Sequence, residues 1–422
     1  MDAALRAPTW RHWAFAHRID LILFSFTLLA YLLSSGSMLA HQSLAPHFVY
    51  QADAFIHGQL ALTTAPPNLN DWVRIGDRWF VSFPPFPAVV LMPLVALFGL
   101  AFNDVAFTIV FGALNVALLY RLLRRWQAAE EGNRTEWEHA AHALVFGFGT
   151  LAWTCAIRGE VWFTAETMGV TLTLLYLHAA HQARHPVLAG LAVACAAITR
   201  APLAFSAIFF LLEAVFGLGR ERVSWAGLKH ALESPERRRE VLKKLVPFAL
   251  AVLAVALPMA WMNEVRFGSP TEFGHSHLYA NRVNQQIQQY GLFHYQFLER
   301  NLHSAFTRLP EIQLHPFKLG FNGEGMSLLV TTPLLLFLLW PREKPRLHRA
   351  LWLTCAVVAV PGFFYQNSGW FQFGFRFSVD YTPILILLLA IGARPLTRVW
   401  WGLASLGFAV NAWGAAVFNR LQ

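Results

Sequence analysis

The sequence predicts an all-α polytopic integral membrane protein. Of its 422 residues, 56% are hydrophobic and only 14% are charged, whereas soluble domains average roughly 45–50% apolar and about 25% charged residues. The apolar residues gather in runs close to the ~20 residues that cross a bilayer. Lys and Arg number 33 against 24 Asp and Glu, and they lie mainly at the ends of these runs. This pattern sets membrane topology and excludes a nucleic-acid-binding or ordinary cytosolic protein.

The first apolar run, near 20–40, is long enough to span the membrane and has no small-x-small cleavage site, so we expect a retained helix. Two shorter pieces meet around Arg200 and must cross as a pair, because basic segments flank both of them. About eleven transmembrane helices result. They lie near 20–40, 104–122, 139–157, 164–181, 187–199, 202–218, 245–262, 326–340, 350–366, 378–393 and 399–418.

Basic clusters fix the orientation of these helices. Short basic loops stay in the cytoplasm, so all clusters should lie on one face, with the N-terminus inside and the C-terminus outside. The clusters are Arg6, Arg11 and Arg18 before the first helix, and the segments 121–138, 219–244, 341–349 and 394–398.

The apolar stretch 84–100 is expected to lie at the outer membrane interface as a juxtamembrane helix. If it crossed, the basic cluster at 121–138 would move outside, and its four prolines also disfavour a straight spanning helix. Residues 1–422 then form a single transmembrane domain. Its two long outer loops, 41–103 and 263–325, are where we expect any chemistry.

The first outer loop holds the leading acidic candidate. On a helix, Tyr50, Asp53 and His57 would share one face. A carboxylate in a membrane-apposed cleft can be desolvated enough to act as a general base. The alternative is an interfacial helix whose Asp53 faces water. Asp71 and Arg74 follow in the same loop, beside aromatic residues that also suit a membrane interface.

Charges also occur in the short outer segment around residue 160. Glu166 lies at the start of a span, where a charge is unfavourable unless it is paired or functional. Arg158 can pair with either Glu160 or Glu166. A structural ion pair and a substrate contact both remain open.

Arg200 and Arg376 each lie at the outer end of an apolar segment, away from the cytoplasmic clusters. The guanidinium fork matches the geometry of a phosphate. The alternative for Arg376 is an i, i+4 pair with Asp380, and the alternative for Arg200 is snorkelling to lipid headgroups.

The second long outer loop offers Arg282 and the pair His275 and His277. Two histidines without a third ligand at suitable spacing are a weak metal signal. We therefore expect neither a metal nor another cofactor. The three cysteines, Cys155, Cys195 and Cys355, lie in apolar stretches and are expected to be small core residues.

This layout resembles the GT-C superfamily of membrane glycosyltransferases that use polyprenyl-phosphate sugars, such as the dolichyl-phosphate-mannose mannosyltransferases. The likeness comprises one helix, a long outer loop with the early Asp53, and then a proline-rich juxtamembrane helix. The stretch 76–85 resembles the family's aromatic-Pro-Pro entry into that helix. Phe373-Gly374-Phe375-Arg376, followed by Pro383, is similar to an arginine-bearing motif of many bacterial members.

The resemblance implies a hexosyl- or pentosyltransferase that transfers sugar with inversion to an extracytoplasmic acceptor. Asp53 would be the catalytic base, and Arg376, or second Arg200, would bind the donor phosphate. Many members carry adjacent acids, whereas alanine follows Asp53 here, so a second acid would come from Asp71 or Glu160. The candidate substrate contacts are Tyr50, His57, Asp71, Arg74, Arg158, Glu160 and Arg282.

The expected partners are a polyprenyl-phosphate-linked sugar, membrane lipid, and a lipid, glycan or protein acceptor. Arg-rich usage favours a bacterial inner membrane with the active site on its outer face. Two other classes stay open. A transporter or flippase of a lipid-linked or small polar substrate often shows internal repeats, and this sequence shows none. A non-catalytic GT-C-like glycolipid-binding protein is compatible with the missing second acid.

Overall fold

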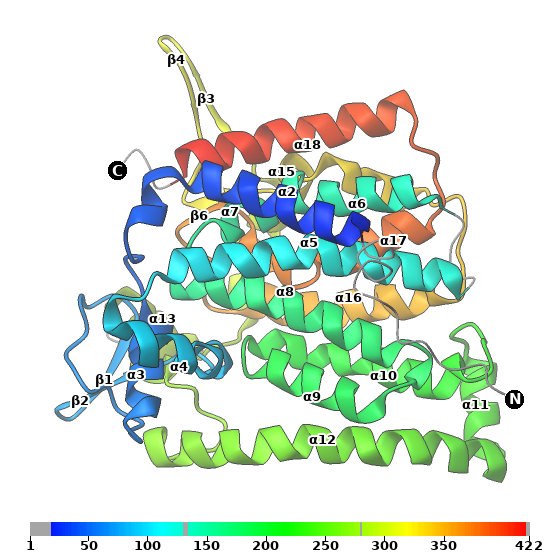
Figure 1. The fold of residues 1–422 in the computed structure, drawn as a ribbon, viewed down its shortest axis with the longest axis horizontal. Helices are drawn as coiled ribbons and strands as arrows, with labels where there is room; N and C mark the ends of the chain where they lie inside the picture. Colours follow the sequence, from blue (N-terminus) through cyan, green and yellow to red (C-terminus); the bar gives the residue numbers. More distant parts are fainter. Residues whose placement is uncertain (1–17, 130–133, 279–280, 419–422) are drawn as a thin grey trace, which may run out of the picture.

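The computed structural model describes residues 18–129, 134–278 and 281–418, and in 281–284 only the backbone. Long helices run side by side along one direction (Figure 1). The bundle helices are α2 (Arg18–Ser35), α5 (Asp104–Ala128), α6 (Glu136–Phe148), α7 (Ala152–Ala156), α8 (Val161–Ala180), α9 (Pro186–Ala197), α10 (Ala207–Leu212), α12 (Pro235–Phe267), α16 (Leu347–Phe364), α17 (Thr382–Ile391) and α18 (Arg398–Val417).

Four described helices are long and apolar enough to cross a membrane: Arg18–Ala40, α5, α12 and α16. Other predicted spans are broken. The run expected at 139–157 is α6 followed by α7, and the run at 326–340 is α15 (Leu328–Thr331) followed by a 3₁₀ segment, Pro333–Leu339. Proline lacks the N–H that would continue the α-helix. The chain is an integral membrane protein, and the count of eleven spans stays a prediction.

The sequence marks several helix ends with capping residues. Thr135 and Glu138 form a reciprocal capping box at the start of α6. Ser234 caps α12 by accepting from the N–H of Arg237. Gly268 ends α12 in the left-handed conformation, at φ 72°.

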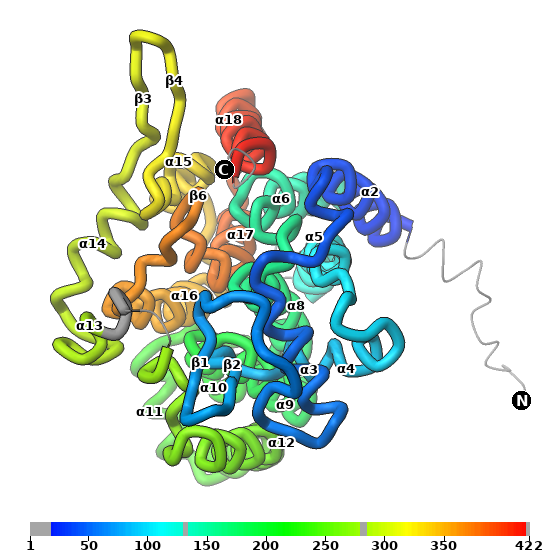
Figure 2. The backbone as a smooth tube through the Cα atoms, turned by 90° about the vertical axis from the view of Figure 1, so that its left-hand side faces the viewer, coloured from blue at the N-terminus to red at the C-terminus, as the bar shows by residue number. Residues whose placement is uncertain are grey.

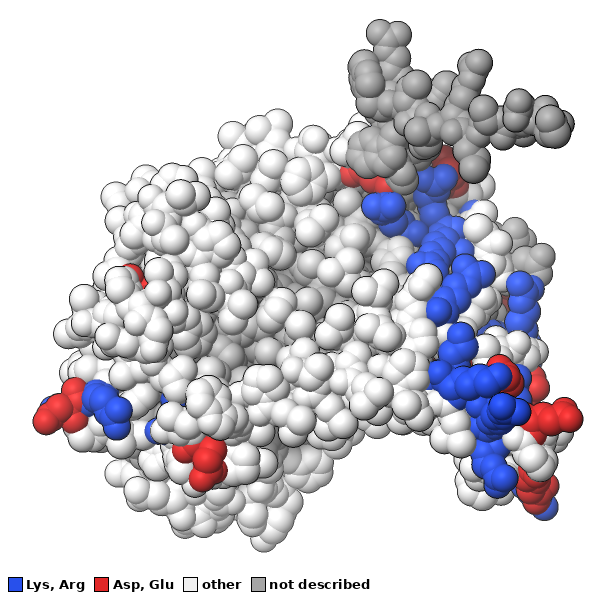
Figure 3. Space-filling view, turned by 60° about the horizontal axis from the view of Figure 1, so that its bottom comes forward, with Lys and Arg blue, Asp and Glu red and all other residues white. Residues whose placement is uncertain are grey.

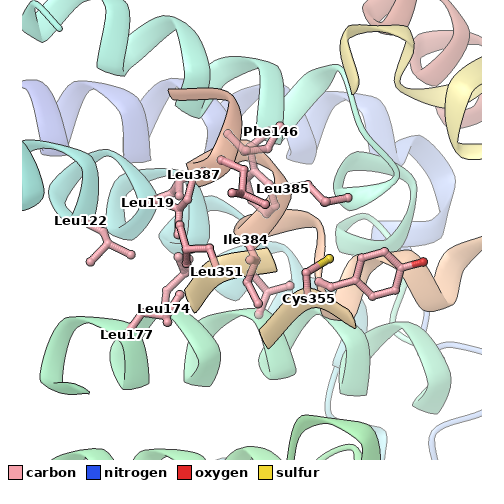
Figure 4. Close-up of a cluster of buried hydrophobic side chains, with 14 of the residues drawn as sticks. Leu119, Leu122, Phe146, Leu174, Leu177, Leu351, Cys355, Ile384, Leu385 and Leu387 are labelled. Carbon is pink, nitrogen blue, oxygen red and sulfur yellow. The ribbon is translucent and has the colours of Figure 1, made fainter. Parts of the chain in front are cut away.

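The centre of the bundle is a cluster of buried apolar side chains from α5, α6, α8, α16 and α17 (Figure 4). Every residue of α17 is buried, which is expected of a helix that is apolar on all sides. Cys355 packs in this cluster. Cys155 and Cys355 are buried and Cys195 is partly buried, in agreement with their predicted core role.

The two ends of the bundle differ in charge. Figure 3 shows Lys and Arg gathered at one end of the molecule. This is the end of Figure 1 at which α11 (Trp225–Glu233) lies and α5 finishes. The opposite end carries the first outer loop. This asymmetry agrees with the prediction that the basic clusters share the cytoplasmic face.

The segment 41–103, predicted to be the first outer loop and called so below, contains α3 (His47–Ile56), β1 (Trp72–Ile75), β2 (Arg78–Val81) and α4 (Phe86–Phe98). The strands form an antiparallel hairpin. Helix α4 packs against α3 at the end of the bundle that lies away from α11 (Figures 1 and 2). Its 13 residues reach about 20 Å, too short for a hydrocarbon core of about 30 Å.

The second outer loop contains α13 (Asn281–Tyr290), α14 (Leu298–Leu302) and a hairpin of β3 (Glu311–Leu314) and β4 (Phe317–Gly320) that projects from the body (Figure 2). It ends in β5 (Glu324–Met326), which pairs in parallel with β6 (Gln372–Gly374). This pairing fixes the segment that carries Arg376.

A pair of reporter fusions tests the orientation. Alkaline phosphatase fused after Phe102 should be active, because 41–103 is predicted to be outside, and a fusion after Glu233 should be inactive. An inactive Phe102 fusion with normal expression would mean that α4 crosses the membrane.

Candidate functional site

Asp53 is held at the rim of the first outer loop by α3. The apolar face of α3, including Phe48 and Val49, packs against α4 and the start of α8. The Asp53 side chain is 15% exposed. Its Oδ2 accepts a short hydrogen bond from the hydroxyl of Thr63, and its Oδ1 lies 3.6 Å from Nδ1 of His57. Asp53 and His57 therefore share one side of the helix, as predicted.

Aromatic stacking fixes the start of α3 against the hairpin. The His47 ring lies on the Trp72 ring, with centroids 3.7 Å apart and planes 8° apart, and Tyr50 meets Trp72 edge-on at 5.7 Å. The Nε2 of His47 lies 3.0 Å from the carbonyl oxygen of Asn70. Burial lowers the pKa of His47 to about 4, so this ring is neutral at physiological pH.

Asp71 directly precedes Trp72 in the chain and has a constrained backbone conformation. Its φ is 59°, a left-handed value that aspartate tolerates better than most residues. The indole Nε1 of Trp162 donates to Oδ2 of Asp71 at 3.1 Å. Burial raises the pKa of Asp71, while the Trp162 hydrogen bond and the charge of Arg376 act in the opposite direction. A carboxylate with a raised pKa is suited to proton transfer.

A buried carboxylate on α8 links the predicted arginines. The Glu166 side chain is 0% exposed. Its Oε1 accepts from an Nη atom of Arg376 at 2.6 Å and lies 3.6 Å from an Nη atom of Arg200. The thiol of Cys155 donates to Oε2 at 3.4 Å. Glu166 is therefore paired, as a charge inside an apolar bundle must be.

Arg200 binds the second buried acid. It donates to both oxygens of Asp380, at 2.5 and 2.8 Å, a bidentate pairing that guanidinium geometry favours. Neither alternative considered for these arginines is seen: Arg376 pairs with Glu166 and not with Asp380, and Arg200 turns inward to Asp380 instead of snorkelling to headgroups. We call Glu166, Arg200, Arg376 and Asp380 the buried charge network.

The backbone around β6 positions Arg376. The Oε1 of Gln372 accepts from the Arg376 N–H at 2.9 Å, and Nε of Arg376 donates to the Gly369 carbonyl at 3.0 Å. Gln372 also donates to the carbonyls of Glu324 and Ser368, both at 2.8 Å. Contacts of β5 with β6 thus set the guanidinium in place, with the rings of Phe163 and Phe377 beside it.

Arg158 and Glu160 bind each other. Nε of Arg158 donates to Glu160 at 3.1 Å, a second guanidinium nitrogen makes a shorter bond, and a third reaches the Phe418 carbonyl at 3.1 Å. The Arg158 guanidinium also lies over the rings of Phe163 and Phe418. These contacts favour a structural ion pair over a substrate contact for Arg158 and Glu160.

Two other candidates lie elsewhere. Arg74 is exposed on the hairpin, where it donates to the Gly76 carbonyl at 3.2 Å and lies 3.7 Å from Asp77. Arg282 falls in α13, and its side chain lies outside the described residues. Among the described residues, no group of three His, Cys, Asp or Glu side chains could hold a metal ion.

Sequence reasoning missed several partners. The pairing of Asp380 with Arg200 joins residues 180 positions apart. The signal that could have found it is charge balance, because two acids and two arginines in apolar segments need one another. No sequence pattern pointed to Trp162 or Thr63 as partners of the loop acids.

Comparison with known proteins gives fold relatives only. No family model and no curated protein matches the chain. The structure of ArnT from Cupriavidus metallidurans bound to undecaprenyl phosphate aligns with a TM-score of 0.52 and 16% identity over 93% of this chain. The apo Archaeoglobus fulgidus oligosaccharyltransferase aligns with a TM-score of 0.53 and 11% identity over 96%.

The chain spans 63% and 56% of the lengths of these two structures. At such identities the likeness concerns the fold. The protein has the fold of GT-C membrane glycosyltransferases, which confirms the fold predicted from the sequence.

Breaking the buried charge network should destabilise the protein. Asp380→Asn leaves Arg200 without its bidentate partner, and we expect a loss of about 3–5 kcal/mol in the free energy of unfolding. Denaturant unfolding in detergent measures this loss. The exposed Asp77→Asn control should change stability by less than about 0.5 kcal/mol. Equal unfolding of Asp380→Asn and wild type would show that the pair contributes nothing.

Acid should weaken the docking of α3 through His47. Folding lowers the pKa of His47, so the folded protein favours the neutral ring. The stability that this ring contributes is fully present above its unfolded pKa of about 6.5. It is lost as pH falls toward its native pKa of about 4. The loss should reach roughly 3 kcal/mol. Proteolysis of the first outer loop at pH 7.5 and pH 4 measures it. The His47→Phe variant keeps a stacking ring and should show a smaller acid effect, and an identical effect would contradict this assignment.

Proposed function

We propose that this protein is a glycosyltransferase that moves a hexosyl or pentosyl group from a polyprenyl-phosphate donor to an acceptor on the outer face of a bacterial inner membrane. The fold supports this proposal, since one structure with the same fold is bound to undecaprenyl phosphate and another is an oligosaccharyltransferase. The observation that carries it is that one turn of α8 contacts both an acid of the first outer loop and the buried arginine: Trp162 donates to Asp71, and Glu166 accepts from Arg376.

Asp53 is the proposed base. Thr63 and His57 orient its carboxylate, which accepts the proton of an acceptor hydroxyl. The acceptor oxygen then attacks the anomeric carbon as the bond from that carbon to the phosphate oxygen breaks. The sugar is transferred with inversion, and polyprenyl phosphate leaves. Asp53 is partly buried on α3 and held by Thr63, which suits proton transfer, because proton transfer depends on a positioned group.

Arg376 is the proposed contact for the leaving phosphate. Negative charge grows on that group as the sugar departs, and a preorganised cation stabilises it most strongly in a water-poor site. Hydrogen bonds to the Gly369 carbonyl and the Glu166 carboxylate fix the Arg376 guanidinium in advance. Arg200 donates to both oxygens of Asp380, so we propose that it does not contact the phosphate directly. It adds a second positive charge next to Glu166.

Asp71 is the better candidate for the second acid. Glu160 is occupied by a buried ion pair with Arg158. Asp71 keeps a raised pKa from burial and lies between Trp162 and the hairpin. We infer that it helps to bind or deprotonate the acceptor alongside Asp53.

A transfer assay tests the base. Purified wild type and Asp53→Asn are given polyprenyl-phosphate sugars with membrane extract as acceptor, and release of polyprenyl phosphate is measured. Asp53→Asn should lower turnover by about 10²–10⁴-fold, the range for general base catalysis, with donor binding retained. Asp77→Asn, on the same loop but exposed, should be as active as wild type.

Wild-type turnover by Asp53→Asn would remove Asp53 from the mechanism. If wild type released no polyprenyl phosphate from any donor, a transporter or a non-catalytic glycolipid-binding protein would become the better interpretation.

A further inference from the structure

A second charged cavity lies at the basic end of the bundle, remote from the outer loops. It has a volume of about 490 Å³ and opens between α2, α5 and α8. No step of the proposed transfer uses it. Its lining residues are Asp20, Leu118, Arg121, Arg124, Arg125, Ala128, Leu175 and His178.

The cavity carries an excess of positive charge. Three arginines of α5 line it against one aspartate. Arg121 lies 3.4 Å from Asp20, and Arg125 donates to the carbonyl of His178 at 2.8 Å. Arg124 reaches Glu136 at 3.2 Å, but both side chains are substantially exposed, so this pair is weak.

The wall of the cavity changes from apolar to polar over one helical turn. On α5, Leu118 precedes Arg121 by three residues, and on α8, Leu175 precedes His178 by three. The two helices pack against each other, so both transitions occur on the same side of the pair. A boundary of this kind is expected where acyl chains meet lipid headgroups.

We propose that this cavity binds the headgroup of an anionic phospholipid of the cytoplasmic leaflet. The arginines hold the phosphate, and the part of the acyl chains next to the headgroup lies over Leu118 and Leu175. Basic pockets between transmembrane helices on the cytoplasmic side bind anionic headgroups in this way. Leu175 is 43% exposed, and this apolar surface favours a lipid over a soluble phosphate. The inference does not depend on the proposed transfer.

Native mass spectrometry of the full-length protein tests this site. The protein is mixed with equal amounts of phosphatidylglycerol and phosphatidylcholine. Wild type should retain one phosphatidylglycerol at least tenfold more strongly than phosphatidylcholine. Arg121→Gln/Arg124→Gln should lose this preference. The matched control Arg238→Gln/Arg239→Gln removes the same charge from exposed positions outside the cavity and should keep it.

A second variant separates the cavity from its charge. Leu175→Trp fills the apolar part without altering any arginine and should also reduce retention. Equal loss in the Arg238→Gln/Arg239→Gln control, or no preference in wild type, would overturn the proposal in favour of general attraction to a basic surface. Displacement of the lipid by millimolar inorganic phosphate would overturn the lipid assignment.

Discussion

The mutual neutralisation of two acids and two arginines inside an apolar bundle is the constraint on which the structure around the candidate site depends. Charges are expensive in a membrane unless they are paired. Glu166 must therefore meet Arg376, and Asp380 must meet Arg200. These pairings join α8, the turn after α9 and the segment after β6. Removing one partner would leave a buried charge uncompensated.

The same constraint brings the first outer loop to the network. Trp162, at the start of α8, donates to Asp71, and Glu166 lies one turn further along that helix. Helix α8 therefore contacts both Asp71, from the first outer loop, and the buried arginines. Stacking of His47 on Trp72 and the apolar contact of α3 with α4 hold α3, and with it Asp53, against the hairpin and α4.

Much of the fold follows from patterns that are local in the sequence. Apolar runs and the basic residues at their ends predict the helices and the charged end of the bundle. The four prolines of 84–100, and the requirement that all basic clusters lie on one side, predict a juxtamembrane helix there instead of a membrane span. The breaks after α6 and at Pro333 were not predicted, because a hydropathy window averages over a chain that changes direction within it.

The site was predicted less completely. Asp53 and His57 are neighbours on one helix, so spacing alone brings them together. Arg376 was singled out by its position at the end of an apolar segment and by a resemblance to a family motif, and the only pairing considered for it was with the nearby Asp380. The actual partner, Glu166, lies 210 residues away. Such long-range pairing depends on how helices pack, and no i, i+4 rule contains that information.

Binding of the released lipid tests the central claim, that Arg376 in the buried charge network receives the phosphate. Affinity of the purified protein for undecaprenyl phosphate is compared for wild type, Arg376→Lys and the control Arg78→Lys, an exposed arginine of the hairpin. A lysine keeps the charge but loses the planar fork. We predict that Arg376→Lys binds at least tenfold more weakly and that Arg78→Lys is unchanged. Equal affinity of all three proteins would contradict the account.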